Sequence, residues 1–453
     1  MRVYAYTQEL FFMNTPRSVT LEKIVALCKR RGFVYPTAEI YSGLNGVYDF
    51  GPLGASMKQN IRQAWINSLK KLDLDILFLE GALLGPEAMW QASGHVDHFN
   101  DPMVDCMSCK KRYRADDPDF NINKPCPHCG NKEWTSVRQF NMMFQTHAGA
   151  SAEHGSVAYL RPETAQVIFV NFKNVLSTNR VKIPFGIAQL GKAFRNEITP
   201  KQFLFRMREF EQMEMEWFCK KEDVSHFFEF WTDQRKQFFI NLGITPERIR
   251  IRPHAADELA HYSSRCNDVE YEFPFGWKEL EGIADRGDFD LTQHTKFAKK
   301  DLSVFDEETK ESYMPHIVEC SVGVDRLFLT LLFDAYYEDV VEGETRTVLR
   351  LDPRIAPIKA AFMPLSKKLT EPIEKLYKEV KKEGLAVMFD ESGSIGKRYR
   401  RQDEIGTPLC ITYDFDSEQD GCATIRNRDT LEQKRIPLTH IARYIHDVVE
   451  QKK

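Results

Sequence analysis

The segment at residues 205–218, FRMREFEQMEMEWF, constrains the fold more than any other stretch of the chain. With the period of two of a β-strand, Met213, Met215 and Trp217 share one face, which is apolar and is expected to pack inward. The opposite face collects guanidinium, aromatic, amide and carboxylate groups, namely those of Arg206, Arg208, Phe210, Gln212, Glu214 and Glu216. These groups are costly to bring together unless a charged ligand lies against them. The pattern therefore predicts a long strand that forms one wall of a ligand site.

Two further segments are expected to complete this site. FGIAQLGKAFRNEITP (185–200) carries Arg195 and Glu197 two residues apart, so that on a strand both side chains would face one side. ECSVGVDRLFLTLLF (319–333) is typical of a short strand followed by an apolar helix, with Arg326 in the first turn. Such a set of groups is what a site for ATP and a cationic small molecule needs.

Length and charge limit the class of protein. A chain of 453 residues is too long for one core, so two or three domains are expected. It has neither a run of about 18 apolar residues that could span a bilayer nor the pattern of a secretory signal, and the cytoplasm is the expected location. The net charge of −4 gives no global sign of nucleic-acid binding, although a local basic stripe is enough to engage phosphates.

A polar stretch at 341–357 divides the chain into a larger front part and a smaller unit. In front, the periodicity predicts strands within 74–84, 137–218, 269–283 and 314–322, and helices at 20–32, 56–72, 163–176, 221–243 and 324–337. Behind it, four short apolar runs alternate with helices at 366–383, 394–404 and 438–451. The fold class is α+β, an antiparallel sheet flanked by helices and followed by an α/β unit. The expected division is a variable arm at 1–18, a main domain at 19–345, a linker at 346–357 and a second domain at 358–453.

A cysteine-rich insertion is expected at about 104–136. Two Cys-x2-Cys pairs, separated by sixteen residues, are formed by Cys106, Cys109, Cys126 and Cys129. The spacing is typical of a structural zinc site with four thiolates, which leaves no open position for catalysis. A pair of disulfides, disfavoured in a reducing compartment, and a role for His128 in place of one cysteine are the alternatives. The six scattered cysteines are expected to be buried thiols: Cys28, Cys219, Cys266, Cys320, Cys410 and Cys422.

Taken in order, the motifs resemble those of a known enzyme family. FRNE (194–197), the 205–218 segment and GVDR resemble motifs 2 and 3 of the class II aminoacyl-tRNA synthetases. With ASGH (92–95), RYRAD, RPETAQ (161–166), ADRGDFDLTQH and ECSVG, they resemble the homodimeric type of glycyl-tRNA synthetase from about residue 20 to the end. One departure is Cys320, where proline is common in that family. Its side chain is expected on the far side of the strand from the site.

The resemblance implies a glycine–tRNA ligase. Such an enzyme activates glycine with ATP to glycyl-adenylate and transfers glycyl to the 3′-terminal ribose of tRNA(Gly). The carboxylate of the substrate attacks the α-phosphate itself, so that positioning and charge neutralisation carry the catalysis. The catalytic residues expected on this basis are Arg195, Glu197 and Arg326. The ATP site is expected to comprise Arg195, Asn196, Glu197, Phe205, Arg206, Arg208, Phe210, Glu279, Leu280, Gly323 and Arg326.

Individual roles follow from the chemistry of these side chains. Arg195 is expected on the α-phosphate and the incoming carboxylate, and Arg326 on the γ-phosphate at a helix N-terminus. Phe210 offers a flat face for adenine, while Arg206 or Arg208 would hold the β- or γ-phosphate. Mg²⁺ is expected with the nucleotide, with Glu279 as its ligand because hard cations prefer oxygen.

Glycine has no side chain to grip, so its pocket must bind the ammonium group and fill the place of a methyl group. By resemblance, the glycine-binding residues are Arg114, Glu163, Phe210, Gln212, Glu214, Arg286, Glu319 and Ser321. The glutamates are expected to converge on the ammonium group. No amino acid smaller than glycine competes, and an editing domain is therefore unnecessary.

The domain at 358–453 resembles the anticodon-binding domain shared by the glycyl, threonyl, prolyl and histidyl enzymes. Its basic cluster is expected to contact tRNA through Lys397, Arg398, Arg400 and Arg401. Residues 56–86 fit motif 1, which forms the subunit interface in the family and ends in a proline that matches Pro86. A homodimer without membrane association is therefore expected.

Alternatives remain open at the level of the sequence. The arginines could form internal ion pairs, Arg195 with Glu197 and Arg326 with Asp325, and His95, His147, His254, His261 and His294 are expected to be structural. The chain could be another synthetase with the same C-terminal module. It could also be a non-catalytic binding protein built on a synthetase fold, although such proteins usually lose the phosphate-binding groups.

Overall fold

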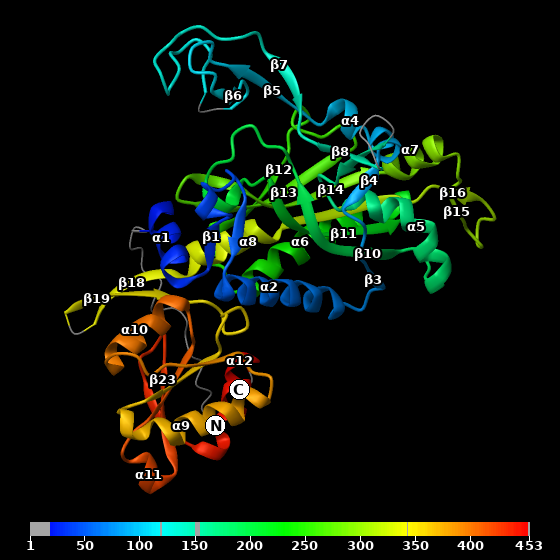
Figure 1. Ribbon diagram of the computed structural model, residues 1–453. Helices are drawn as coiled ribbons and strands as arrows, with labels where there is room; N and C mark the ends of the chain where they lie inside the picture. Colours follow the sequence, from blue (N-terminus) through cyan, green and yellow to red (C-terminus); the bar gives the residue numbers. More distant parts are fainter. Residues whose placement is uncertain (1–18, 118–119, 150–154, 342, 452–453) are drawn as a thin grey trace.

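A computed structural model describes residues 19–117, 120–149, 155–341 and 343–451. The expected arm at 1–18 lies outside these residues. The main body is built on a seven-stranded sheet with the order β12-β13-β14-β17-β11-β10-β3 (Figure 1). The strands are β3 (Ile76–Leu79), β10 (Phe185–Phe194), β11 (Glu209–Cys219), β12 (Ile249–Pro253), β13 (Arg265–Phe273), β14 (Gly276–Gly287) and β17 (His316–Gly323). All neighbours are antiparallel except β3 and β10.

The strand β17 is the last of the seven in the sequence but lies in the interior of the sheet, between β14 and β11. Its register sets Ser321 opposite Glu214, and Glu319 opposite Glu216. The alternation predicted for residues 205–218 is thereby extended across a second strand, and the carboxylates of both strands share one face.

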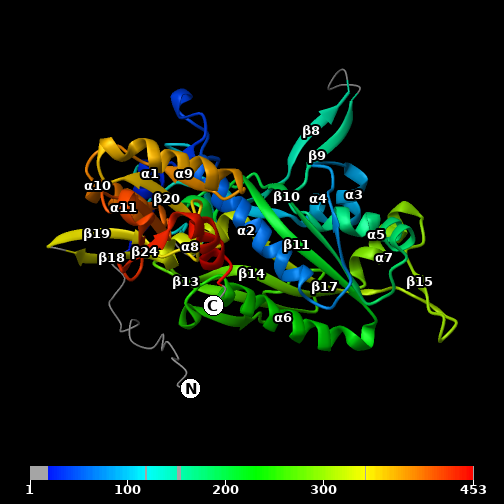
Figure 2. The ribbon, with the colours of Figure 1, turned by 90° about the horizontal axis from the view of Figure 1, so that it is seen from below.

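Helices cover both faces of the sheet. The predicted apolar face of β11 packs against α2 (Pro52–Lys70), α6 (Val224–Asn241) and α8 (Val324–Ala335), and α2 crosses β10 and β11 (Figure 2). The indole ring of Trp217, for instance, lies 5.5 Å from that of Trp231 in α6. The opposite face carries α5 (Ala165–Asn179) and α7 (Phe289–Ala298) beside Phe218. The charged site therefore lies on the α5 and α7 side.

Smaller elements surround the main sheet. A three-stranded sheet made of β5 (Asn100–Asp105), β6 (Arg112–Arg114) and β7 (Arg138–Asn141) projects from the body (Figure 1). A second one contains β4 (Leu84–Pro86), β8 (Phe144–Ala148) and β9 (Ser156–Leu160). The remaining elements of the body are α1 (Leu21–Arg31), β1 (Val34–Pro36), β2 (Tyr48–Phe50), α3 (Glu87–Ala92), α4 (His95–His98), β15 (Val304–Phe305), β16 (Ser312–Tyr313), β18 (Tyr336–Val341) and β19 (Glu344–Leu349).

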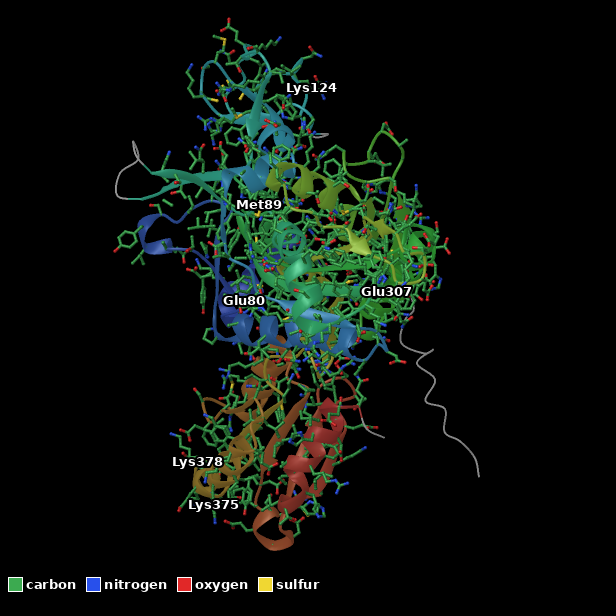
Figure 3. The ribbon with its side chains drawn as sticks, turned by 90° about the vertical axis from the view of Figure 1, so that its right-hand side faces the viewer. Glu80, Met89, Lys124, Glu307, Lys375 and Lys378 are labelled. Carbon is green, nitrogen blue, oxygen red and sulfur yellow. The ribbon has the colours of Figure 1, made fainter. Side chains whose placement is uncertain are left out.

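The C-terminal module has its own core and a five-stranded sheet of order β21-β20-β22-β23-β24. Its elements are β20 (Ala360–Pro364), α9 (Thr370–Lys382), β21 (Val387–Phe389), α10 (Ile395–Ile405), β22 (Leu409–Tyr413), α11 (Ser417–Asp420), β23 (Cys422–Asn427), β24 (Gln433–Pro437) and α12 (Ile441–Val449). In Figure 3, Lys124 of the projecting insertion and Lys375 of α9 lie at opposite ends of the molecule. None of the described helices combines the length and the apolar character needed to cross a membrane.

Several expected boundaries are wrong. The helix expected at 56–72 begins at Pro52, where proline is favoured in a first turn, and Gly54 allows it to approach the carbonyl group of Phe33. The apolar run at 74–84 is divided between β3 and β4 of two different sheets. The polar stretch at 341–357 contains β19, which pairs with β18 and extends into the expected linker.

The strands that carry the site are shorter than predicted. β10 ends at Phe194, so that Arg195 and Glu197 follow the strand and do not alternate along it. Likewise β11 begins at Glu209, which leaves Arg206 and Arg208 in the preceding loop. The remaining members of the charged face, from Phe210 to Glu216, lie on β11 as predicted.

Candidate active site

A cavity of about 220 Å³ lies on the charged face of the main sheet. The predicted site residues that line it are Glu163, Arg195, Gln212, Glu214, Glu279, Glu319 and Ser321. They come from β11, β14, β17, the residue after β10 and the segment before α5, so that the sheet brings together residues more than 150 positions apart. A larger cavity of about 810 Å³, between α2, α6 and the end of α12, contains none of them.

Glu214 is the most firmly held carboxylate of the cavity. One oxygen accepts hydrogen bonds from Ser321 Oγ at 2.6 Å and Gln212 Nε2 at 2.9 Å. The other accepts from the backbone N–H of Thr164 at 2.7 Å and from its hydroxyl group. Burial and the nearby charge of Glu163 raise the pKa of Glu214. Glu214 is therefore a buried carboxylate with both oxygens bonded, and not a solvated surface charge.

Arg286 and Glu319 form a buried ion pair beside it. Arg286 Nη1 donates to Glu319 Oε2 at 2.5 Å, and Asp290 accepts from the other side of the guanidinium group at 2.8 Å and 2.9 Å. The guanidinium carbon lies 3.8 Å from the ring centre of Tyr262, which fixes its plane. Burial raises the pKa of Glu319 to about 7, although Arg286 opposes the shift. Arg286 thus orders the pocket rather than lining it.

Glu163 is the third carboxylate. Its oxygens lie 3.2 Å from His95 Nε2 and 3.0 Å from Gln166 Nε2. Burial raises the pKa of Glu163, but His95 and Arg286 together lower it further, so the net shift is below the usual value. Glu163 is therefore the carboxylate of this cluster that stays ionised, and His95 has the structural role that was expected.

Arg195 faces the cavity from the end of β10. Its Nε donates to Pro162 O at 3.1 Å, and its guanidinium group lies 5.3 Å from the ring centres of both Phe99 and Phe210. Glu197 is only 8% exposed, and its Oε2 accepts no hydrogen bond from the described residues. Arg195 lines the cavity and Glu197 does not, and the contacts of Arg195 do not include the ion pair with Glu197 that was the alternative.

Arg326 also differs from the ion-pair alternative. Its Nη1 donates to Glu279 O at 2.9 Å and lies 3.3 Å from Glu279 Oε2, while the guanidinium group stacks 4.4 Å from the ring centre of Phe205. Asp325 instead binds Lys58 at 2.6 Å. Arg326, Glu279 and Phe205 therefore form one cluster near Gly323 at the start of α8, and Glu279 is its member that lines the cavity.

Other predicted residues have structural contacts. Arg208 donates to the backbone oxygens of Glu197 at 2.9 Å and Asn45 at 2.6 Å, and so fixes the loop instead of offering a free cation. The backbone of Asn196 donates to Met142 O, and Arg206 is half-buried. The side chain of Leu280 belongs to the main core, which leaves only its backbone for ATP.

Arg114 lies outside the cavity. It pairs with Asp101 at 2.9 Å and with Asp116 at 2.8 Å, on β6 of the projecting sheet. Arg114 therefore does not line this cavity, and its place in the glycine pocket stays a prediction.

The basic cluster of α10 is divided by burial. Arg398 is 5% exposed and donates to Pro364 O at 2.5 Å and Gly393 O at 3.1 Å, which makes it a structural residue. Arg401 binds Asp390 at 2.7 Å. Lys397 is exposed and Arg400 is partly exposed. Only these last two offer a solvent-facing charge without a close bidentate partner.

The cysteine quartet is assembled as its spacing predicts. The Sγ atoms of Cys106 and Cys129 are 3.5 Å apart, those of Cys109 and Cys126 are 3.7 Å apart, and all four lie within 4.8 Å of one another. Disulfide sulfurs would be about 2.05 Å apart, whereas four thiolates about 2.3 Å from one zinc ion are separated by roughly 3.8 Å. The residues therefore fit a tetrahedral zinc ion and not a pair of disulfides.

Several residues of the site were not predicted from the sequence. Thr164 donates a hydrogen bond to Glu214, Gln166 donates one to Glu163, and Asp290 accepts one from Arg286. A signal existed for Asp290, because it lies four residues after Arg286, a spacing that favours ion pairs. Tyr262 had no such signal, since it lies in a loop between β12 and β13.

Comparison with known proteins agrees with this geometry. A family model of the "tRNA synthetase class II core domain (G, H, P, S and T)" matches residues 144–336, and one of an "Anticodon binding domain" matches residues 359–447. The chain is 50% identical to a glycine–tRNA ligase of Caldanaerobacter subterraneus subsp. tengcongensis and 48% identical to one of Geobacillus kaustophilus, each over 95% of this chain and 99% of the relative. A glycine–tRNA ligase of Alkaliphilus oremlandii is 49% identical over 94% of this chain and 98% of its own length. The chain therefore belongs to the glycine–tRNA ligases, a family of class II aminoacyl-tRNA synthetases.

Proposed function

We propose that this chain activates glycine with ATP to glycyl-adenylate and diphosphate, and then transfers glycyl to the 3′-terminal ribose of tRNA(Gly). The observation that carries the proposal is the buried group of Glu163, Glu214 and Glu319 within one cavity that also holds Arg195. One guanidinium group, that of Arg286, only partly offsets these carboxylates. A ligand with an ammonium group next to a carboxylate complements such a site.

The chemistry of the first step needs positioned charges only. Glycine would lie with its ammonium group against the glutamates and its carboxylate toward Arg195. A carboxylate oxygen attacks the α-phosphorus of ATP, the bond from that phosphorus to the α,β-bridging oxygen breaks, and diphosphate leaves. Arg195 neutralises charge at the α-phosphate, and Arg326 that on the far phosphates. In the second step a ribose hydroxyl group attacks the glycyl carbonyl carbon, and AMP leaves.

Selection of glycine follows from the size of the cavity and the contacts of Glu214. Its two oxygens are already held by four hydrogen bonds, so it cannot move aside for a β-carbon. A methyl group is worth only about 1–3 kcal/mol in an apolar pocket, but a clash with a rigid wall excludes a larger substrate more strongly. Alanine and serine should therefore be rejected without an editing site.

Two metal ions belong to the proposal. Glu279, whose side chain is 49% exposed at the mouth of the cavity, offers oxygen atoms that fit Mg²⁺, which would screen the phosphate charges. The thiolates of Cys106, Cys109, Cys126 and Cys129 would hold a structural Zn²⁺ that stabilises the insertion at about 104–136.

The larger organisation is proposed on the same basis. Residues 19–345 would form the catalytic domain and 358–453 the anticodon-binding domain, joined by 346–357. A homodimer through motif 1 is supported by exposed apolar side chains in that region, Phe78, Leu83 and Leu84.

Lys397 and Arg400 would contact tRNA phosphates. A cytoplasmic location fits the ten free cysteines.

The proposal is tested by ATP–diphosphate exchange with glycine, alanine and serine. Exchange should depend on glycine, and Arg195→Ala should lower kcat/KM by about 10²–10³-fold, the usual loss when one donor to a developing charge is removed. The control is Arg443→Ala, because the Arg443 side chain is 87% exposed on α12. Comparable exchange with alanine would identify a different amino acid, and undiminished exchange in Arg195→Ala would refute the mechanism.

A further inference from the structure

A cluster of three different donor groups lies on the wall of the cavity, on and beside β13 rather than on the strands that carry Glu214 and Glu319. Cys266 and Asp268 are two positions apart on β13, so both side chains face the same side of the strand. His254 follows β12, which pairs with β13, and its backbone N–H donates to Cys266 O at 2.9 Å. The pairing of the two strands therefore places an imidazole, a thiol and a carboxylate together.

The distances within the cluster fit one metal ion. His254 Nε2 lies 2.9 Å from Asp268 Oδ2, and one donor atom of each residue lies within 4.8 Å of the other two. Ligands at about 2.0–2.3 Å from a tetrahedral zinc ion are separated by roughly 3.3–3.8 Å. Movements of about 1 Å or less, within the range of side-chain torsions, bring the three atoms to those separations.

The nature of the donors selects the class of ion. Mg²⁺ and Ca²⁺ prefer sites made of oxygen atoms alone, whereas imidazole and thiolate favour zinc and its neighbours in the first transition series. All three residues line the cavity, which leaves the fourth coordination position open on that side. We propose that His254, Cys266 and Asp268 bind a divalent transition-metal ion of the zinc class, at a site separate from the cysteine quartet.

The position of the site has a consequence for activity, which rests on the proposed function, whereas binding of the ion does not. Glu279 and Glu319 line the same cavity of about 220 Å³. An ion with its open position in so small a space takes up volume and attracts the carboxylates that the substrates need. Occupation of the site therefore inhibits the activation of glycine.

Binding is tested on the full-length protein as purified, with Co²⁺ as the probe. Cobalt bound to a thiolate gives a charge-transfer absorption band, and a tightly held zinc ion in the cysteine quartet stays in place during the titration. The wild-type chain should bind one Co²⁺ with the band of a single thiolate, and Cys266→Ser should lose that band. Cys422→Ser, a partly exposed cysteine of the C-terminal module, is the matched control and should retain it. Circular dichroism shows that each variant is folded.

Two outcomes of the titration overturn the proposal. One is a wild-type chain without the band, and the other is the same band in Cys266→Ser. The functional part is measured separately, as the Zn²⁺ concentration that halves glycine-dependent exchange. It should rise at least tenfold in Cys266→Ser relative to wild type and Cys422→Ser. Equal inhibition of all three proteins, together with a normal titration, would retain the metal site and reject inhibition through it.

Discussion

At the scale of single residues, burial and neighbouring charges shift the pKa values of the acidic side chains in the cavity. Glu163, Glu214 and Glu319 lie on or beside the same sheet face, but their surroundings shift the pKa down for Glu163 and up for the other two. His95 and Arg286 lower the pKa of Glu163, whereas burial dominates for Glu214 and Glu319. Of these three carboxylates, Glu163 keeps its negative charge, whereas the charge of Glu319 depends on pH in the neutral range.

The KM for glycine should therefore depend on pH. The pKa of Glu319 is raised to about 7, so the carboxyl group is neutral below that pH and charged above it. Only the charged form attracts an ammonium group, which means that KM should fall as the pH rises from 6 to 8. The change should be up to about tenfold per pH unit below 7, since one unit of protonation is a factor of ten. Exchange kinetics at saturating ATP measure it.

Glu319→Gln provides the comparison. This variant should have a higher KM at pH 8 and a shallower dependence on pH, because glutamine carries no titrating charge and keeps the shape of the side chain. A wild-type KM that is constant from pH 6 to pH 8 would contradict the assignment of Glu319 to the ammonium group.

At the scale of elements, a buried group of charges joins two helices to the central sheet. Lys58 on α2 lies 2.6 Å from Asp325 on α8 and 3.1 Å from Glu211 on β11. Asp325 also accepts from the backbone N–H of Glu211 at 2.7 Å. Because Arg326 is the next residue along α8, the same contacts that hold the helix also fix the place from which Arg326 reaches the cavity.

Lys58→Met should strongly destabilise the main body. The change leaves the buried carboxylate of Asp325 without its cation, whereas Glu211 keeps Arg62, and the loss of one partner of a buried pair typically costs about 3–5 kcal/mol. Unfolding by urea, followed through the buried tryptophans Trp65, Trp217 and Trp231, measures the shift of the midpoint. Lys70→Met, at the exposed end of the same helix, should change the free energy of unfolding by less than about 1 kcal/mol. A double variant with Asp325→Asn should lose less than the sum of the two single variants, and strict additivity would argue against the coupling.

Two element boundaries also show which features of the fold a sequence pattern can predict. The helix at 21–31 was predictable because Thr20 caps its first turn and Gly32 adopts a left-handed conformation at its end. The hairpin of β18 and β19 was not, because β19 begins in a polar stretch and is held in part by the C-terminal module, through contacts such as Arg346 Nη1 with Arg428 O at 3.0 Å. Local periodicity carries no information about such partners.

At the scale of the whole molecule, the main sheet and the C-terminal module occupy separate regions, and α10 of the module packs against β19 and α1 (Figure 1). Within the module, α10 packs on one face of the sheet and α9 with α12 on the other, as two right-handed crossovers in opposite directions require. The exposed charges Lys397 and Arg400 on α10 therefore face away from those of α9.

Binding of tRNA should depend on α10 rather than α9. The double variant Lys397→Ala/Arg400→Ala should weaken binding and reduce the salt slope by about 1 for each lost phosphate contact, with glycine-dependent diphosphate exchange unchanged. Lys375→Ala/Lys378→Ala on the opposite face removes the same charge and serves as the control (Figure 3). Equal weakening by both double variants would mean that only net charge matters. Arg398 is unsuitable for such a test, because its replacement removes hydrogen bonds from the interior of the module.

The composition of the site could be predicted largely from the sequence, but not its geometry. The period of two identified Glu214, and the ordered motifs identified Arg195, Glu319 and Arg326. What the sequence could not supply were the contacts that decide which charges are free, such as Arg208 on backbone oxygens or Arg114 on Asp101. Such contacts depend on where a loop ends and on which side chain lies nearest. Neither feature produces a periodic pattern in the sequence.

The interior position of β17 in the sheet affects how the polypeptide folds during its synthesis. Until residues 316–323 leave the ribosome, β10 and β11 on one side and β12 to β14 on the other are two half-sheets, each with an unpaired edge. Open edges are templates for aggregation, so the nascent protein passes through a vulnerable interval that ends when this one strand inserts. Insertion of β17 also brings Glu319 and Ser321 into the cavity. A protein truncated before residue 316 would therefore be prone to aggregation and would lack part of the site.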